Sequence, residues 1–369
     1  MRQTILAGLL AFIIAMFFAG CSNTTGPCSC DDELEYISPE DAGWDSEALD
    51  AAMEYAGEIG YNAIMMLYDG KVFLEWGDVE TDYRCHSIRK PFLSGLIGMA
   101  VEDGVIDLDD TLGDLGIDDI PPSLTVEEKT ATVRMLMQSR SGVYHEAAGE
   151  TQEMMDSRPA RGSHHPGTFY YYNNFDFNVL GTIYREQTGE DIFEAFRQRV
   201  ALPTGMEDFD TSLCGYEYEP LKSEHPVYSF RMSARDMARF GVLYQQRGMW
   251  RGERLLSSDW IDECTAASSV ADSASGLGYG YMWAVFPEGS LLAQLVGYPG
   301  FYHTGVGVHA LVIVPDLKLV VVQRLDTDQP GWTDPGDEAT FTLIQMLFDA
   351  RTEVRGSVGP EPRSSNRIQ

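Results

Sequence analysis

A serine and a lysine one helical turn apart could form a nucleophile with its own base. Ser87 and Lys90 stand three residues apart at the expected start of a helix, so their side chains would share one face. A serine hydroxyl is a weak nucleophile until a neighbouring base takes its proton. Lysine can be that base if burial and nearby cations lower its pKa by about 3 units. This spacing alone is weak evidence, because it also occurs at exposed helix starts.

A second group of polar residues follows a Pro-Gly turn. The phenol of Tyr172, beside a protonated lysine, could ionise, act as a general base and return the proton to a leaving group. Asn174 is two residues further on, so in an extended loop it would point the same way and could hydrogen-bond a substrate amide. The alternative is an aromatic packing loop, because tyrosines occupy all three positions 170–172.

A third polar element precedes an apolar run near the C-terminus. It consists of His303, Thr304 and Gly305, and the glycine would let a substrate lie against the edge of the strand. The adjacent His164 and His165 have no carboxylate or cysteine cluster at ligand spacing, so a solvated loop is preferred and no metal is expected. The chain also lacks the G-x-S-x-G turn of α/β-hydrolases. No cofactor is predicted.

The elements that must position these residues are strands near both chain ends and a mostly helical stretch between them. Two apolar, β-rich runs, 62–68 and 71–76, flank Asp69-Gly70, which is a strong hairpin signal. A second hairpin is expected at 308–314 and 318–324, around Pro315-Asp316. Helical spacing is found at 46–59 (with Ser46 as N-cap), 91–102, 133–138, 178–188, 192–200, 234–246, 258–266 and 339–351. The predicted fold class is therefore α+β, with an antiparallel sheet built from both chain ends, flanking helices and an inserted, mostly helical lobe.

The N-terminus predicts export rather than a membrane-spanning helix. Its apolar run is shorter than the roughly 20 residues that cross a bilayer, and it ends in small residues before Cys21. We interpret residues 1–21 as a lipoprotein signal peptide ending in a lipobox, with lipidation at Cys21. Plain signal-peptide cleavage nearby is the alternative. The expected location is the cell envelope, at the periplasmic face of a bacterial membrane, with membrane contact only through the lipid.

The rest of the chain divides into four parts. Residues 22–35 read as a flexible tether and residues 353–369 as a disordered tail. Between them, residues 36–352 are expected to form one hydrolase-sized domain. Its sheet lobe would comprise 36–86 and 295–352, and its helical lobe 87–294.

The charge of the chain limits its partners. It has 26 Lys and Arg against 57 Asp and Glu, a net charge of −31. That balance argues against nucleic acid and against an anionic membrane surface as a partner. The six cysteines show no dense disulfide framework; Cys214 and Cys264 could pair, but two separate thiols are the preferred interpretation.

Together, the three polar elements resemble the class C β-lactamase and penicillin-binding-protein family of serine hydrolases, including its esterase and amide-hydrolase branches. The motifs occur in the family's order: S-x-x-K at Ser87–Lys90, Y-x-N at Tyr172–Asn174 and K/H-T-G at His303–Gly305. The likeness extends from about residue 40 to residue 350. Supporting stretches lie at 102–108, 141–143, 230–240 and 250–260.

The resemblance implies an acyl-enzyme mechanism. Ser87 would attack an acyl carbon, Lys90 and Tyr172 would share the proton transfers, and water would hydrolyse the acyl-enzyme. The oxyanion hole would use the backbone N–H groups of Ser87 and Val306. Because His303 replaces the lysine of the lactamases, a small ester or amide is the favoured substrate. The alternatives are a β-lactamase or D-alanyl-D-alanine carboxypeptidase, and a non-catalytic binding lipoprotein of the cell envelope.

Overall fold

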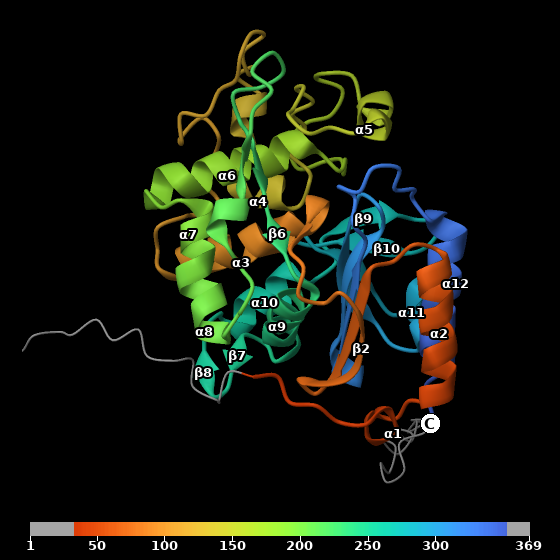
Figure 1. Ribbon diagram of the computed structural model, residues 1–369. Coiled ribbons are helices and arrows are strands. Elements are labelled where there is room, and N and C mark those ends of the chain that lie inside the picture. The colour runs from red at the N-terminus through yellow and green to blue at the C-terminus, as the bar shows by residue number, and fades with distance from the viewer. Residues whose placement is uncertain (1–32, 353–369) are drawn as a thin grey trace, which may run out of the picture. The chain divides into compact units, whose positions relative to one another are not determined.

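An eight-stranded antiparallel sheet separates two groups of helices in the computed structural model, which describes residues 33–352 (Figure 1). Neighbouring strands run in opposite directions throughout. In spatial order the strands are β2 (Lys71–Gly77), β1 (Ala63–Tyr68), β14 (Leu319–Arg324), β13 (His309–Val314), β12 (Gly300–Gly305), β11 (Ala284–Phe286), β10 (Leu277–Tyr279) and β9 (Ser269–Asp272). Strands from the two chain ends thus meet at β1 and β14, which confirms the predicted α+β sheet.

Both faces of the central strands are buried. Successive side chains of a strand point to opposite faces, so Ile64 and Met66 face one group of helices while Met65 and Leu67 face the other. The first group covers the outer face; it consists of α1 (Pro39–Ala42), α2 (Ser46–Glu58), α11 (Leu291–Val296) and α12 (Gly336–Asp349), with α2 against α12. This is why β1 reads as a continuous apolar run.

The second group of helices forms a separate lobe on the inner face. Within it, α9 packs directly against β1, β13 and β14. Its members are α3 (Arg89–Glu102), α4 (Val133–Met137), α6 (Asn174–Thr188), α7 (Ile192–Phe196), α8 (Leu202–Thr204), α9 (Ala234–Gln245) and α10 (Ser258–Cys264). Three two-stranded ribbons complete it: β3 (Tyr83–Arg84) with β6 (Arg231–Met232), β4 (Gly215–Glu217) with β5 (Val227–Ser229), and β7 (Met249–Trp250) with β8 (Glu253–Arg254).

The predicted hairpins are present. Asp69 and Gly70 have φ values of 49° and 80°, the left-handed pair that a two-residue turn matched to strand twist requires. At the second hairpin, Pro315–Leu317 form a short 3₁₀ turn and Lys318 takes the left-handed conformation. Helix α2 begins at Ser46, but its N-cap lies one position earlier than expected, because Asp45, and not Ser46, accepts the N-cap hydrogen bond from Ala48 N at 2.8 Å.

The sheet takes in more of the chain than the sequence suggested. Strands β9, β10 and β11 come from 269–286, inside the range 87–294 that was assigned to the helical lobe. Each has only three or four residues, and Gly276, Gly278 and Gly280 interrupt their apolar pattern. Such short runs become strands through pairing with β12, which sequence periodicity does not record.

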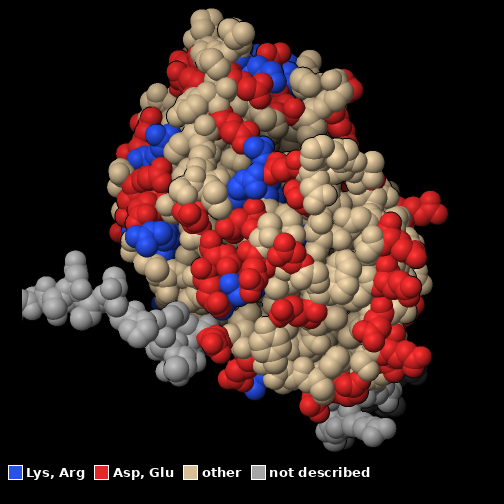
Figure 2. Space-filling model, viewed as in Figure 1, with Lys and Arg blue, Asp and Glu red and all other residues tan. Residues whose placement is uncertain are grey.

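Among the charged side chains on the face shown in Figure 2, acidic ones cover more of the surface than basic ones, with red along the edge where α2 lies. Between residues 33 and 352, no helix is long and apolar enough to cross a membrane. Cys85, Cys214 and Cys264 are free thiols, so Cys214 and Cys264 are not bridged. The predicted signal peptide with Cys21, nearly all of the predicted tether and the predicted tail lie outside the described residues.

Candidate active site

Ser87 lies in a tight turn at the boundary between the two lobes. The turn is a 3₁₀ segment, η1 (His86–Ile88), that leads directly into α3. His86, the residue before the serine, has φ of 47°, a conformation that few non-glycine residues adopt. The turn contacts β12 and β13 of the sheet. Ser87 is therefore presented by a constrained turn rather than by the helix itself.

Lys90 is placed between the serine and the tyrosine. Its Nζ lies 2.8 Å from Ser87 Oγ and 2.6 Å from Tyr172 Oη. The side chain is 1% exposed, and its Nζ also lies 4.6 Å from the ring centroids of Tyr172 and Phe177. The three groups predicted to carry the chemistry are thus in hydrogen-bonding contact.

The environment drives the lysine and the tyrosine toward their neutral forms. Burial, and then the positive charge of Arg89, hold the pKa of Lys90 well below its usual value. Burial raises the pKa of Tyr172 above its usual value, against a smaller lowering by its hydrogen bond to Ser87. A neutral amine has a lone pair that can take a proton, and a neutral phenol has a proton that it can give.

Arg89 is a buried cation with no carboxylate partner among residues 33–352. It is 3% exposed, and its Nη2 donates to Asn178 Oδ1 at 3.1 Å. Its guanidinium carbon lies 4.2 Å from the ring centroid of Tyr228. An unneutralised positive charge next to Lys90 in sequence disfavours a second one, as the lowered pKa of Lys90 reflects. No pattern in the sequence indicated this role.

The loop that carries Tyr172 is fixed by a buried carboxyl group. Asp176 Oδ1 accepts hydrogen bonds from Ser141 Oγ at 2.5 Å and from Asn173 Nδ2 at 3.1 Å. Asn173 Nδ2 also donates to the carbonyl oxygen of Val143 at 2.7 Å. This network ties the start of α6 to the loop after α4, and so sets the position of the tyrosine that precedes it.

Asn174 lies elsewhere than the extended loop that was expected. It is the first residue of α6, and its Nδ2 donates to the carbonyl oxygen of Gly149 at 2.6 Å. It is 5% exposed and does not line the active-site cavity. Asn173, just before it, caps the helix. A substrate contact by Asn174 stays a prediction.

His303 is buried on β12 and electrically neutral. Burial, and then the charge of Lys90, lower its pKa to about 3. Its Nδ1 lies 2.8 Å from the carbonyl oxygen of Thr304; since a carbonyl only accepts, this nitrogen carries the ring proton. Nε2 is therefore an acceptor, and it has no hydrogen-bond partner among the described residues.

Gly305 is needed for a reason other than the one expected. A Cβ at this position would lie 2.8 Å from the carbonyl oxygen of Cys85 and 3.0 Å from His86 Cβ. The missing side chain lets β12 lie directly against the turn of Ser87. Thr304 and Val306, on either side, line the same cavity as Ser87, and Val306 is 41% exposed.

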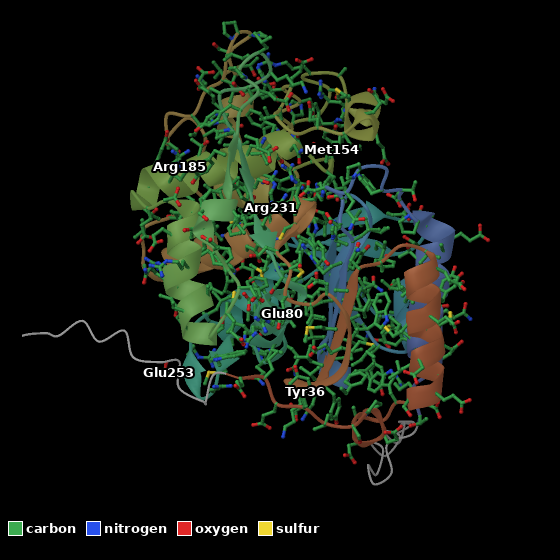
Figure 3. All side chains as sticks on the ribbon, in the orientation of Figure 1. Tyr36, Glu80, Met154, Arg185, Arg231 and Glu253 are labelled. Carbon is green, nitrogen blue, oxygen red and sulfur yellow. The ribbon has the colours of Figure 1, made fainter. Side chains whose placement is uncertain are left out.

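A cavity of about 640 Å³ opens over Ser87. Tyr172 and His303–Val306 line it, together with residues that the sequence did not single out. Among these are Glu153 and Met154 of α5 (Gln152–Ser157); Met154 lies near the end of the sheet where α5 sits (Figure 3). The sequence of α5 is short and polar, so only the tertiary structure reveals it as a wall of the site.

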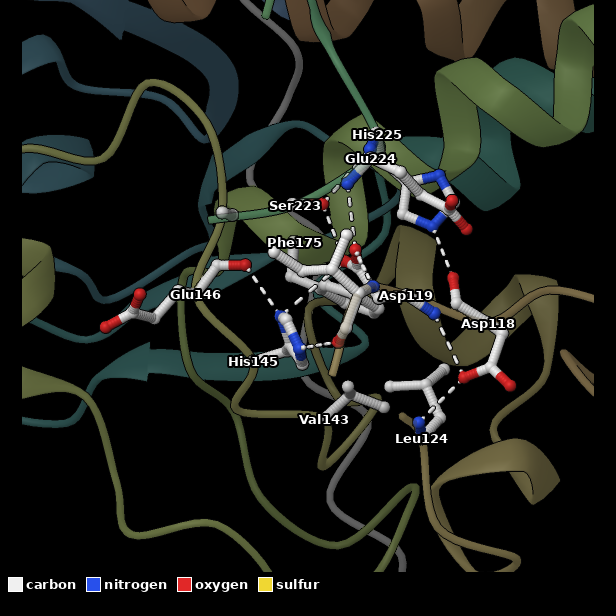
Figure 4. Close-up of polar contacts among 12 residues, drawn as sticks. Asp118, Asp119, Leu124, Val143, His145, Glu146, Phe175, Ser223, Glu224 and His225 are labelled. Carbon is white, nitrogen blue, oxygen red and sulfur yellow. Dashed lines mark hydrogen bonds and ion pairs between the residues drawn. The ribbon is translucent and has the colours of Figure 1, made fainter. Parts of the chain in front are cut away.

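Histidines outside the cavity serve the structure. His145 is 6% exposed; its Nδ1 lies 2.9 Å from the carbonyl oxygen of Glu146 and its Nε2 3.1 Å from that of Ile120 (Figure 4). His164 stacks on Phe169, with ring centroids 3.9 Å apart. Neither imidazole lines the cavity.

A group of possible metal ligands is already committed to protein contacts. The ligand atoms of Asp119, Glu224 and His225 lie within 4.8 Å of one another. Asp119 accepts hydrogen bonds from Ser223 Oγ at 2.6 Å and from Glu224 N at 2.8 Å. His225 Nε2 lies 2.7 Å from the carbonyl oxygen of Asp118 (Figure 4). These bonds join two loops, and the cluster is assigned no metal.

Comparisons with known proteins identify the family of the chain. A family model described as Beta-lactamase matches residues 49–339. Similar solved structures include a putative 6-aminohexanoate-dimer hydrolase from Bacillus anthracis, with 19% identity, TM-score 0.59 and 80% of each chain covered. EstCE1, a hydrolase with promiscuous acyltransferase activity, has 16% identity and TM-score 0.59, covering 84% of this chain and 99% of its own.

A third similar structure is a beta-lactamase/D-alanine carboxypeptidase from Pseudomonas syringae. It has 18% identity and TM-score 0.59, covering 82% of this chain and 99% of its own. At these identities the likeness establishes the fold alone. No curated protein matches the chain in sequence.

Proposed function

Since the chain belongs to the Beta-lactamase family, we propose that it is a serine hydrolase that cleaves a small ester or amide through an acyl-enzyme on Ser87. The observation that carries the proposal is the position of Lys90 Nζ, buried between Ser87 Oγ at 2.8 Å and Tyr172 Oη at 2.6 Å. Burying a lysine is costly unless a carboxylate pairs with it, and Lys90 has no such partner among residues 33–352. A role in packing alone would therefore not explain a lysine buried beside a serine hydroxyl.

The directions of the two pKa shifts support the following proton transfers. Neutral Lys90 takes the proton of Ser87 as the oxygen attacks the acyl carbon. The phenol of Tyr172, kept protonated by burial, gives its proton to the leaving group and recovers one from Lys90. Water then attacks the acyl-enzyme by the reverse route. The oxyanion is held by the backbone N–H groups of Ser87 and Val306, which line the same cavity.

The state of His303 supports a substrate without a carboxylate. With its pKa lowered to about 3, the imidazole carries no positive charge at neutral pH to pair with one. The net charge of −31 adds a long-range repulsion toward anions. Hydrolysis of a β-lactam or of a D-alanyl peptide, which the names of similar structures suggest, is therefore the second candidate.

A substrate panel with a matched variant tests the proposal. We expect the full-length protein to turn over p-nitrophenyl butyrate with higher kcat/KM than nitrocefin at neutral pH. A fluorophosphonate probe should label Ser87, and Ser87→Ala should lose both the label and the ester hydrolysis. Faster hydrolysis of nitrocefin would favour the β-lactamase alternative. Labelling that survives Ser87→Ala would refute the nucleophile, and absence of any turnover would favour a binding lipoprotein.

We also propose that the N-terminal segment exports the protein and anchors it by a lipid on Cys21. The support is the apolar run that ends in small residues before that cysteine. The hydrolase would then act at the periplasmic face of a bacterial membrane, with the tether holding the catalytic domain away from the lipid.

A further inference from the structure

The charged lining of the active-site cavity is of one sign only. Among the described residues that line it, Glu153 is the only Asp, Glu, Lys or Arg. Lys90 lies behind Ser87 rather than in the lining, and burial lowers its pKa and so disfavours its charged form. A ligand in the cavity therefore meets one formal charge, and that charge is negative.

Glu153 is available to a ligand. Its side chain is exposed, and no hydrogen bond or ion pair to its carboxylate occurs within residues 33–352. The helix that carries it is held in place, because Tyr171 Oη donates to the carbonyl oxygen of Met154 at 2.6 Å. Arg158, after α5, is bound to Glu150 at 2.5 Å, so it does not neutralise Glu153.

A second group in the cavity also lacks a donor. His303 is 4% exposed and lines the cavity, and its Nε2 is the acceptor nitrogen without a partner. A buried acceptor that is left unpaired is unfavourable, so a ligand that supplies an N–H group gains by pairing with it. The exposed carboxylate of Glu153 is likewise an acceptor of hydrogen bonds, and it carries a negative charge. Both polar groups thus favour ligands that donate hydrogen bonds.

The remaining walls suit a cation. Six aromatic residues line the cavity: Phe169, Tyr170, Tyr171, Tyr172, Tyr279 and Tyr302. Burial raises the pKa of Tyr170 and of Tyr302, so these phenols stay neutral. The faces of neutral aromatic rings attract ammonium groups.

From these features we propose that the substrate is an ester or amide that carries an ammonium group, which Glu153 and the aromatic walls recognise. The proposal rests on the hydrolase function and specifies its substrate class. Hydrolysis itself is unchanged: water adds across the acyl bond, and the ammonium group takes no part in bond making. The negative charge of the whole protein brings such substrates toward the cavity.

Matched substrates isolate the charge. The full-length protein is assayed with p-nitrophenyl 6-aminohexanoate, with the neutral heptanoate ester, in which a methyl group replaces the ammonium, and with the mono-p-nitrophenyl ester of heptanedioic acid, which is anionic. Acetylthiocholine and its uncharged carbon isostere place the charge on the leaving group instead. We expect kcat/KM for the cation to exceed that for its neutral partner by about fivefold in at least one pair, the effect of one exposed ion pair. The anionic ester should be the poorest.

Variants locate the effect. Glu153→Gln keeps the shape of the side chain and should reduce the cation-to-neutral ratio of kcat/KM to near unity. Asp156→Asn is the matched control: it removes the same charge one helical turn further along α5, outside the cavity lining, and should leave the ratio unchanged. Without any variant, hexylammonium should inhibit hydrolysis of the neutral ester more strongly than hexan-1-ol.

Two results would overturn the inference. Equal or lower kcat/KM for the cation in both pairs would show that the cavity does not recognise ammonium. The second result is a cation-to-neutral ratio that is unchanged in Glu153→Gln but lower in Asp156→Asn. It would show that the preference for cations comes from the overall negative charge of the protein and not from Glu153. In either case, hydrolysis of the neutral ester that Ser87→Ala abolishes would leave the proposed function standing.

Discussion

Arg89 and Arg185 both pack over a tyrosine ring, but only Arg89 is expected to affect the pKa of Lys90. Each guanidinium lies over a tyrosine ring, Arg89 at 4.2 Å from the centroid of Tyr228 and Arg185 at 4.4 Å from that of Tyr216. Only Arg89 is buried next to Lys90, and its charge contributes to the lowered pKa of that lysine. Under the proposed mechanism, Arg89 is thus a positioning residue that acts through Lys90, the proposed base.

Replacing Arg89 should therefore shift the pH dependence of the enzyme. Lys90 must be neutral to accept a proton, so activity falls as the pH drops below its pKa. Arg89→Met removes a neighbouring cation, raises that pKa, and should move the acidic limb of kcat/KM to higher pH by roughly 1 unit. Arg185→Met is the control and should leave the limb in place. An unmoved limb in Arg89→Met would leave burial as the sole cause of the shift.

The sequence allowed the positions of some site residues to be predicted but not those of others. Ser87, Lys90 and Tyr172 were predicted together because their chemistry requires contact, and in the structure Lys90 Nζ lies within 2.8 Å of both hydroxyl oxygens. Asn174 was expected in a loop, since nothing in the sequence shows that Asn173 begins a helix there. The role of Glu153 was not predicted, because its significance lies in the cavity that other segments complete.

Among the elements of the site, β12 packs directly against the turn η1. Gly305 permits it, since a Cβ there would lie 2.8 Å from the carbonyl oxygen of Cys85. Any side chain must push the strand away from the turn. The two backbone N–H groups proposed for the oxyanion hole belong to these two elements, so their separation depends on this glycine.

Gly305→Ala should lower kcat by about 10²-fold, the effect of losing one oxyanion-hole donor. Gly215→Ala provides the control, because Gly215 begins β4 with no atom within 4 Å of its would-be Cβ. Steady-state kinetics and thermal unfolding of both variants are the measurements. Near-normal kcat in Gly305→Ala would place the oxyanion hole elsewhere.

The elements themselves were predictable where local patterns are strong. The turn at Asp69-Gly70 determines its hairpin through two left-handed residues, which the sequence makes plain. By contrast, β9–β11 depend on pairing with β12, and α5 depends on the tyrosine loop beneath it. Neither dependence leaves a periodic signal in the chain.

At the scale of the whole molecule, the proposed lipid anchor at the N-terminus would determine where the protein acts. Metabolic labelling with a fatty-acid analogue should mark the full-length protein, and Cys21→Ser should abolish the mark. The residues concerned lie outside the described part of the chain, so the expectation rests on the sequence. Wild-type protein that stays unlabelled in the soluble fraction would indicate cleavage without lipidation.

The junction between β1 and β14 also constrains how the molecule assembles. Ala63 pairs with Arg324 and Tyr68 with Leu319, so the central ladder joins residues from nearly opposite ends of the described chain. The hairpin of β1 and β2 is synthesised early but keeps an unsatisfied edge until β14 exists. Contacts of such high sequence separation make folding slow, because a long loop must close before they form. The inner face of the sheet includes the strands that contact the turn of Ser87. It is therefore completed only after almost the entire domain has been synthesised.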